Sequence, residues 1–249
     1  MQNIGEPSRG VGVRLLEDGQ IRLDSFAYNA DDAALHPGRV TVRSEVWPQW
    51  LITAREELAS ARDARDANPG LDAGSEFDNA VLHEYRSAMI CICAVAFTLE
   101  AFTNSVVARY PHVQRPSIVR SNGGQSSAAA RHHQIWTGAF RLTNTNSANT
   151  KNTLKQIFAL RNAAVHASAD FVDPVGHPVF RVALEGRFVT YTVENATDAY
   201  MAAVDALEHL LGRPRGEAPE WLAWCAAMST RLTTINSPPL TASTSYDTN

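Results

Sequence analysis

The hydrophobic residues of this sequence recur mostly at intervals of three and four, which is the spacing of a helix that buries one face. This spacing predicts helices over residues 48–66, 75–110, 151–167, 196–211 and 219–232. Proline and glycine interrupt helices, and they follow the first of these segments at Pro69-Gly70 and the fourth at Gly212 and Pro214. We therefore expect a mainly α fold, a bundle of four to five helices.

Apolar runs on both sides of a turn-forming pair predict one or two small β-hairpins in addition. Residues 13–15 and 21–23 flank Asp18-Gly19, and a third short strand is expected over 40–46. Residues 179–184 and 188–193 flank Glu185-Gly186, which places a second hairpin within 178–193.

The predicted elements divide the chain into three parts. Residues 1–46 form a leader with short strands, 47–235 form the helical domain, and 236–249, rich in Pro, Ser and Thr, form a tail expected to be disordered. Within the helical domain, 111–150 is rich in Ser, Asn, Gly and Arg and predicts a long basic loop with an ordered patch around Trp136. A loop of this length inside a compact domain usually has a function of its own.

Apolar segments and cysteines bear on the compartment. The most apolar stretch, 88–102, is shorter than the roughly 20 residues of a membrane-spanning helix, and it contains Glu100, so we expect a core helix and no membrane contact. The N-terminal residues lack an apolar targeting segment, which favours the cytoplasm. Cys91, Cys93 and Cys225 suit reduced core thiols, and two cysteines spaced by two on a helix point to nearly opposite sides. We therefore expect no metal ion and no cofactor.

Charge is distributed unevenly along the chain, although the net charge is only -4. Residues 101–169 contain no Asp or Glu but eight Lys and Arg residues, and we refer to them as the acid-free segment. Such a segment attracts polyanions, so RNA is the expected partner. Its candidate phosphate contacts are Arg115, Arg120, Arg131, His132 and Lys155. The alternative is a polar loop that lacks acids by chance.

Three polar residues, Arg161, Asn162 and His166, interrupt the apolar pattern at the C-terminal end of the helix predicted over 151–167. Asn162 and His166 share one helix face, whereas Arg161 lies about 140° around the helix axis from His166. An imidazole titrates near neutrality and can transfer a proton, and a guanidinium can neutralise charge on a phosphate. This combination suits cleavage of RNA by its own 2'-hydroxyl group, without a metal ion.

The arrangement Arg161-Asn162-x3-His166 resembles the R-x4-6-H motif of the HEPN superfamily (higher eukaryotes and prokaryotes nucleotide-binding), in which Asn commonly follows the Arg. The resemblance extends to a HEPN-like helical bundle with an acidic residue among apolar ones on an earlier helix, here Glu100. It implies a metal-independent endoribonuclease that acts as a homodimer, with Arg161 and His166 catalytic, Asn162 supporting and Glu100 orienting. It also implies a toxin or defence setting with an antitoxin protein as partner.

Other interpretations of the same residues stay open. One is a non-catalytic HEPN-like module that binds a nucleotide, RNA or a protein. Another is purely structural: Arg161 pairs with a surface acid, His166 is a cation stabilised by the helix dipole, and Glu100 pairs with a structural arginine. Residues 131–133 also fit an ordinary exposed loop. The directions in which Arg161 and His166 project distinguish these interpretations.

Overall fold

The computed structural model describes residues 12–15, 21–24, 26–27, 43–67, 74–110, 127–166, 173–177, 179 and 183–237. The chain divides into two compact units, Met1–Val46 and Trp47–Asn249. The described residues of the first unit include four short strands, and those of the second form seven helices and two short strands. The fold of the described part is therefore mainly helical.

The first unit contains two antiparallel strand pairs. β1 (Gly12–Leu15) pairs with β2 (Ile21–Asp24), which confirms the hairpin predicted around Asp18-Gly19. β3 (Phe26–Ala27) pairs with β4 (Arg43–Ser44), so the strand predicted over 40–46 is confirmed at two residues. Strands of two residues are too short to show the alternation that identifies a strand in a sequence.

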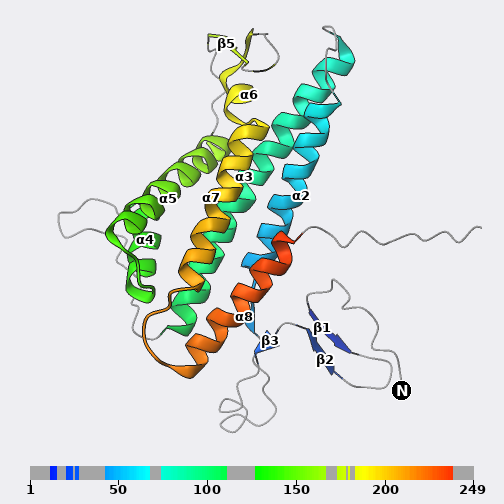
Figure 1. Cartoon of the computed structure of the whole chain (residues 1–249). Helices are drawn as coiled ribbons and strands as arrows, with labels where there is room; N and C mark the ends of the chain where they lie inside the picture. Colours follow the sequence, from blue (N-terminus) through cyan, green and yellow to red (C-terminus); the bar gives the residue numbers. More distant parts are fainter. Residues whose placement is uncertain are drawn as a thin grey trace, which may run out of the picture. The chain divides into compact units, whose positions relative to one another are not determined.

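The two longest helices, α2 (Trp47–Asp66) and α3 (Ser75–Arg109), pack side by side in the second unit (Figure 1). Both helices confirm the predictions made from hydrophobic spacing. α2 buries the residues that recur at helical intervals, which are Trp47, Leu51, Ala54, Leu58 and Ala61. On α3 the ring of Phe102 lies 5.7 Å from that of Trp47 and 6.0 Å from that of Trp136, and this aromatic contact joins three helices.

α3 is long and apolar enough, by length and composition, to cross a membrane. In the bundle, 56 % of its most apolar 18-residue stretch is buried against other parts of the protein. Burial of this kind is what the core helix of a bundle shows, and one helix that meets the length criterion is weak evidence for a membrane span.

The segment predicted as a loop over 111–150 is helical through most of its second half, so this prediction is wrong there; residues 111–126 lie outside the described part. α4 (Ala128–Ala139) begins at Ser127, whose side chain accepts a hydrogen bond from the backbone of Ala130 at 3.2 Å. α5 (Asn144–Val165) begins at Thr143 in the same way. Serine and threonine are favoured at helix starts as well as in loops, and composition alone does not separate the two.

Burial of one side of α4 explains why this segment is ordered. Ile135, Trp136 and Ala139 are buried, and Phe140 follows them at 0 % exposure. The indole Nε1 of Trp136 donates to Oγ1 of Thr103 on α3 at 2.9 Å, so the buried ring has a partner for its polar atom. The ordered patch predicted around Trp136 is therefore part of a helix.

The second predicted hairpin, within 178–193, is also corrected by the structure. The strands that pair are β5 (Val175–Gly176) and β6 (Ala183–Leu184), and residues 186–190 form the short helix α6 (Gly186–Thr190). The rings of Phe188 and Tyr191 both contact Tyr85 on α3, at 4.7 and 5.8 Å. These two rings are three residues apart, the spacing of a helix, and their common contact favours a helical turn over a strand.

α7 (Val193–Leu211) and α8 (Pro219–Asn236) complete the second unit and confirm the last two predicted helices. α7 buries Tyr200, Val204 and Leu207 against α3 and α2. In Figure 1, α4 and α5 lie on one side of α7, and α2 and α8 on the other. Asn236, assigned to the tail from the sequence, ends α8; residues 238–249 lie outside the described part.

Candidate functional site

The residues Arg161, Asn162 and His166 occupy the C-terminal end of α5. The helix ends at His166, where φ is -117° and ψ is 25°, while the backbone N–H of His166 still donates to the carbonyl of Asn162 at 3.0 Å. The side chains of Asn162 and His166 are exposed, whereas Arg161 is half-buried. Two residues of the motif are therefore open to solvent, and the third is partly covered.

Arg161 packs inward against its own helix. Its guanidinium carbon lies 5.4 Å from the ring centre of Phe158, a residue that is 4 % exposed. The Nε atom of Arg161 is buried without a hydrogen-bond partner, and the side chain makes no ion pair with the described residues. A buried donor without an acceptor costs about 1–3 kcal/mol. This guanidinium thus contacts an aromatic ring and has no acidic partner among the described residues.

His132 of α4 lies on the same aromatic ring. Its imidazole stacks on Phe158 at 5.1 Å with an angle of 10° between the ring planes, and its Nδ1 is buried without a partner in the described part. Burial, together with the positive charges of Arg131 and Arg161, lowers the pKa of His132 to about 4. The imidazole is therefore neutral at pH 7 and adds no charge for binding phosphate.

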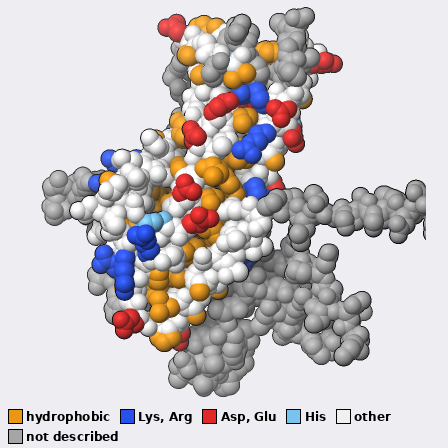
Figure 2. All heavy atoms as spheres, in the orientation of Figure 1, with side chains coloured by type: hydrophobic (Ala, Val, Ile, Leu, Met, Phe, Trp, Pro, Cys, Tyr) orange, Lys and Arg blue, Asp and Glu red, His pale blue; other side chains and the backbone are white. Residues whose placement is uncertain are grey.

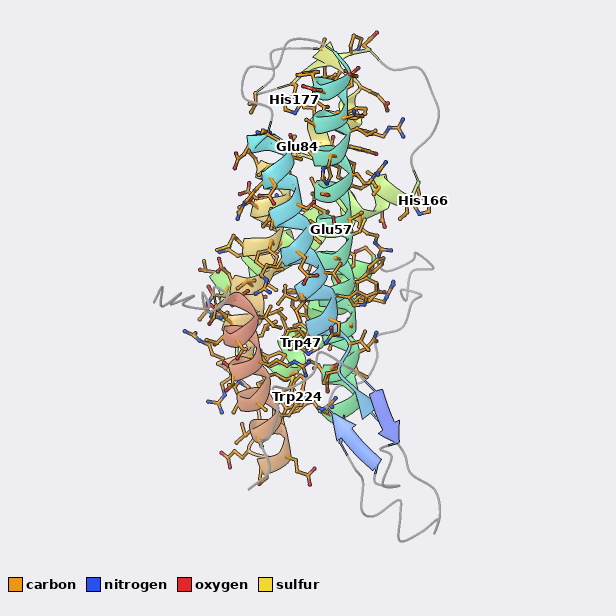
Figure 3. The ribbon with its side chains drawn as sticks, turned by 90° about the vertical axis from the view of Figure 1, so that its right-hand side faces the viewer. Trp47, Glu57, Glu84, His166, His177 and Trp224 are labelled. Atoms are coloured by element: carbon orange, nitrogen blue, oxygen red, sulfur yellow. The ribbon has the colours of Figure 1, made fainter. Side chains whose placement is uncertain are left out.

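His166 lies at the outer edge of the bundle, where α5 ends (Figure 3). Neither it nor Asn162 makes a side-chain hydrogen bond or an ion pair with the residues that the structure describes. The guanidinium of Arg161 instead contacts the ring of Phe158, on which His132 also stacks. On a helix, positions 161 and 166 leave the axis about 140° apart, so the spacing does not favour convergence of the imidazole and the guanidinium within one chain.

Glu100 lies on the same face of α3 as Cys93. Burial raises the pKa of Cys93, and the positive charge of Arg161 opposes this shift. Glu100 is seven residues, or two turns, beyond Cys93 and shares its helix face. It is half-buried and makes no hydrogen bond or ion pair with any described residue. Its orienting role stays a prediction.

The other candidate phosphate contacts are spread over two helices. Arg131 is half-buried on α4 and Lys155 is exposed on α5, while Arg115 and Arg120 lie outside the described part. Residues 131–133 belong to α4, which corrects the alternative that they form an exposed loop. In the described part, the acid-free segment forms the end of α3, α4 and α5, and these three helices contact one another.

A second polar cluster, which the sequence analysis missed, joins α2, α3 and α7. Arg65 of α2 donates through Nε to Oε2 of Glu84 at 2.7 Å and through Nη1 to Oε1 of Glu194 at 2.8 Å. Glu84 is 2 % exposed and its Oε1 also accepts from the backbone N–H of Val193 at 3.1 Å, at the start of α7. The pairing of residues so far apart in the chain follows no spacing rule, so no sequence signal identifies it.

His177 lies near this cluster at the end of the bundle that carries β5 (Figure 3). It is 5 % exposed, and its Nδ1 accepts from the backbone N–H of Val179 at 3.2 Å. The pKa of His177 is lowered, mainly by burial. The negative charges of Glu84 and Glu194 oppose this shift, and the positive charge of Arg65 adds to it. The buried Glu84 already has a cationic and a backbone partner, which is the arrangement of a structural network.

Two further sources of a functional assignment are possible metal-binding groups and similar proteins of known function. Among the described residues no group of three or more His, Cys, Asp or Glu side chains is placed to hold a metal ion. Cys91 and Cys225 are buried free thiols, and Cys93 is a half-buried one. Comparison of the chain with protein-family models, curated proteins and solved structures gives no match.

Proposed function

We propose that the protein is a metal-independent endoribonuclease of the HEPN type. The observation that carries the proposal is the end of α5, where His166 and Asn162 are exposed and the guanidinium of Arg161 has no acidic partner among the described residues. This end belongs to the acid-free segment, which repels RNA less than the rest of the protein does. RNA is accordingly the proposed substrate.

The proposed reaction needs two proton transfers, one from the RNA to a base and one to the leaving oxygen. A base removes the proton of the 2'-hydroxyl group, whose oxygen then attacks the adjacent phosphorus; the P–O5' bond breaks, and the leaving oxygen receives a proton. The products end in a 2',3'-cyclic phosphate and a 5'-hydroxyl group. His166 transfers protons, Arg161 neutralises charge on the phosphate oxygens, and Asn162 orients the phosphate.

The proposal requires a second copy of the chain. Because the helical spacing separates Arg161 and His166 by about 140° around α5, a second copy is the simpler way to bring both groups to one phosphate. In a two-fold dimer, Arg161 of one protomer and His166 of its partner are able to face the same site, since each copy offers the same surface to the other. The proposed active form is therefore a homodimer.

The test measures cleavage of single-stranded and structured RNA in EDTA by the wild-type protein and by Arg161→Ala and His166→Ala. We expect each substitution to reduce the rate by about 100-fold or more. His83→Ala, which removes another exposed histidine, is the matched control and keeps full activity. Equal cleavage by the wild type and His166→Ala contradicts the proposal.

Mixing the two inactive variants tests the shared site. If Arg161 and His166 come from different protomers, half of the mixed dimers are hybrids and one of the two sites in each hybrid is intact. The mixture then regains about a quarter of the wild-type activity. If both residues of a site come from one chain, the mixture stays inactive.

The packing of Arg161 on Phe158 favours a second candidate function, a non-catalytic module that binds RNA or a nucleotide. In that case the arginine holds a phosphate at the helix end without any proton transfer. Binding then survives His166→Ala, weakens with Arg161→Ala and falls steeply as salt is raised. Binding without cleavage in EDTA would decide for this candidate.

A further inference from the structure

A continuous groove runs along the seam between α5 and α7. Two hollows of 500 and 310 Å³ lie end to end in this seam, and Thr153 and Ala202 line both of them. At one end of the groove, Nδ2 of Asn146 on α5 lies 2.8 Å from Nε2 of His209 on α7, a polar contact between the two walls. In Figure 2, which shows the face that carries α5 and α7, uncharged polar surface lies beside acidic side chains.

The charged side chains of the groove are two carboxylates. Asp198 lines the larger hollow and Asp205 the smaller one, and neither makes a hydrogen bond or an ion pair with the described residues. No Lys or Arg is among the described residues that line either hollow. Asp205 also borders the seam on the other side of α7, where Arg55 and Arg62 donate to neutral acceptors. Within the groove between α5 and α7, the charge of the described lining residues is therefore negative.

The spacing of these carboxylates sets the size of a ligand. Asp198 and Asp205 are seven residues apart on α7, so they share one helix face and lie about 10.5 Å apart along its axis. Ala202 lies between them. On the opposite wall, Gln156 lines the hollow of Asp198 and Asn149 that of Asp205. Each carboxylate thus shares its hollow with a side-chain amide, and an apolar stretch separates the two polar ends.

A buried hydroxyl group without a partner belongs to the Asp205 end of the groove. Thr150 on α5 is 7 % exposed, lines the smaller hollow and makes no hydrogen bond with the described residues. Its oxygen is not among the fully enclosed polar atoms, so a molecule in the groove can reach it. Thr98 and Thr103 bond to the carbonyl four residues earlier in their helix, and Thr150 does not. A buried polar group of this kind indicates a partner from outside the chain.

We propose that this groove binds a linear polyamine, with one terminal ammonium group at Asp198 and the other at Asp205. An ammonium group donates three hydrogen bonds and accepts none, so it suits a site made of oxygen acceptors. The amide oxygen of Gln156 accepts at one end, and the oxygens of Asn149 and Thr150 accept at the other. The methylene chain lies over the apolar stretch between the two ends.

The proposed ligand differs in charge from RNA. Two carboxylates without a cation beside them in the groove repel phosphates and attract amines. The site is therefore distinct from the end of α5, although the same helix contributes to both.

The test measures binding of spermidine to the full-length protein by isothermal titration calorimetry, in about 0.15 M KCl to screen unspecific attraction. The extended chain of spermidine is long enough to span the two carboxylates. Putrescine carries the same terminal groups on a chain that is too short, and a straight-chain diol of the length of spermidine carries no charge. We expect one spermidine per chain, bound about fivefold or more tightly than putrescine, and no binding of the diol.

Variants of the full-length protein locate the site. Asp198→Asn and Asp205→Asn should each weaken spermidine binding about fivefold, because each removes the partner of one ammonium group. Thr150→Val removes an acceptor without changing the charge, and should weaken binding while the Tm stays within the error of the measurement. Asp63→Asn is the matched control, since it removes the same charge from an exposed position of α2 outside the groove lining, and should leave binding within about twofold.

Three results would overturn the proposal: no saturable binding of spermidine, putrescine bound as tightly as spermidine, or equal losses in Asp63→Asn and Asp205→Asn. Binding of a tetralysine peptide as tight as that of spermidine would instead assign the groove to a basic segment of a protein. Because the readout is polyamine binding, it is independent of RNA cleavage.

Discussion

Arg65 donates to Glu84 across two helices, with Nε 2.7 Å from Oε2, at a position where the carboxylate is 2 % exposed. The same carboxylate accepts the backbone N–H of Val193 and so caps the first turn of α7. One acid thereby ties α2, α3 and α7 together. Removal of one partner from a buried pair leaves the other charge without compensation, which is more costly than the loss of the pair itself.

Glu84→Ala should therefore lower the free energy of unfolding by about 3–5 kcal/mol, the usual effect of breaking a buried pair. Urea titration followed by circular dichroism measures it. Glu185→Gln is the control, because Glu185 pairs with Arg187 at a position where both side chains are partly accessible to water, and we expect a far smaller change. A Glu84→Ala variant as stable as the wild type would show that the network does not hold the bundle together.

The stability of the protein should decrease as the pH falls from 6.5 to 4. In the folded protein burial lowers the pKa of His132 to about 4, whereas the pKa of a histidine in the unfolded chain is about 6.5. Between these values the unfolded chain binds the additional proton, so the free energy of unfolding falls with the pH. His132→Phe, which keeps an aromatic ring on Phe158, should make this dependence flatter.

The control for the pH experiment is His83→Phe, at an exposed position of α3. The difference between the profiles of the wild type and each variant is the quantity to compare, because other histidines also titrate. Titration of the imidazole by NMR gives the pKa of His132 directly. A midpoint near 6.5 would contradict the burial of this ring.

The long helices could be predicted because their apolar residues are periodic. α2, α3 and α8 begin at or within one residue of the predicted positions, and α7 ends at Leu211 as predicted. The prediction failed for α4 and the first two turns of α5. Residues 144–150 consist of Asn, Thr, Ser and Ala with a single buried position, Thr150, so they lack an apolar stripe. Their helix depends on the Thr143 cap and on packing against neighbouring elements, which a local pattern does not show.

The same limit applies to the candidate site. The sequence placed Arg161, Asn162 and His166 at a helix end and gave their angular separation, since both follow from residue spacing. It did not give the contact of Arg161 with Phe158 or the stacking of His132, because His132 was not predicted to lie on a helix. The pKa of His132 depends on that burial, so a residue expected to bind phosphate is neutral at pH 7.

The hydrogen bond between Trp136 and Thr103 should contribute to the stability of the core. Thr103→Val keeps the side-chain volume but removes the acceptor of the buried indole N–H, which should cost about 1–3 kcal/mol. Thr98→Val is the matched control, since Oγ1 of Thr98 is also buried but only donates to the carbonyl of Ala94 in the same helix. Thermal unfolding of the two variants should show a larger loss for Thr103→Val, and equal losses would contradict a specific role of the bond.

A final prediction separates a functional Arg161 from a structural one. Arg161→Met keeps an unbranched side chain against Phe158 and removes a buried donor that has no partner in the described part of the chain. If the role of the guanidinium is to bind a phosphate, the variant should be as stable as the wild type or more stable, because the cost of the unpaired donor disappears. It should at the same time lose RNA cleavage and RNA binding. Differential scanning calorimetry and a filter-binding assay measure the two properties on one preparation. A clear decrease of Tm with RNA binding unchanged would show that Arg161 serves the fold, and the proposed site at the end of α5 would then lose its phosphate ligand.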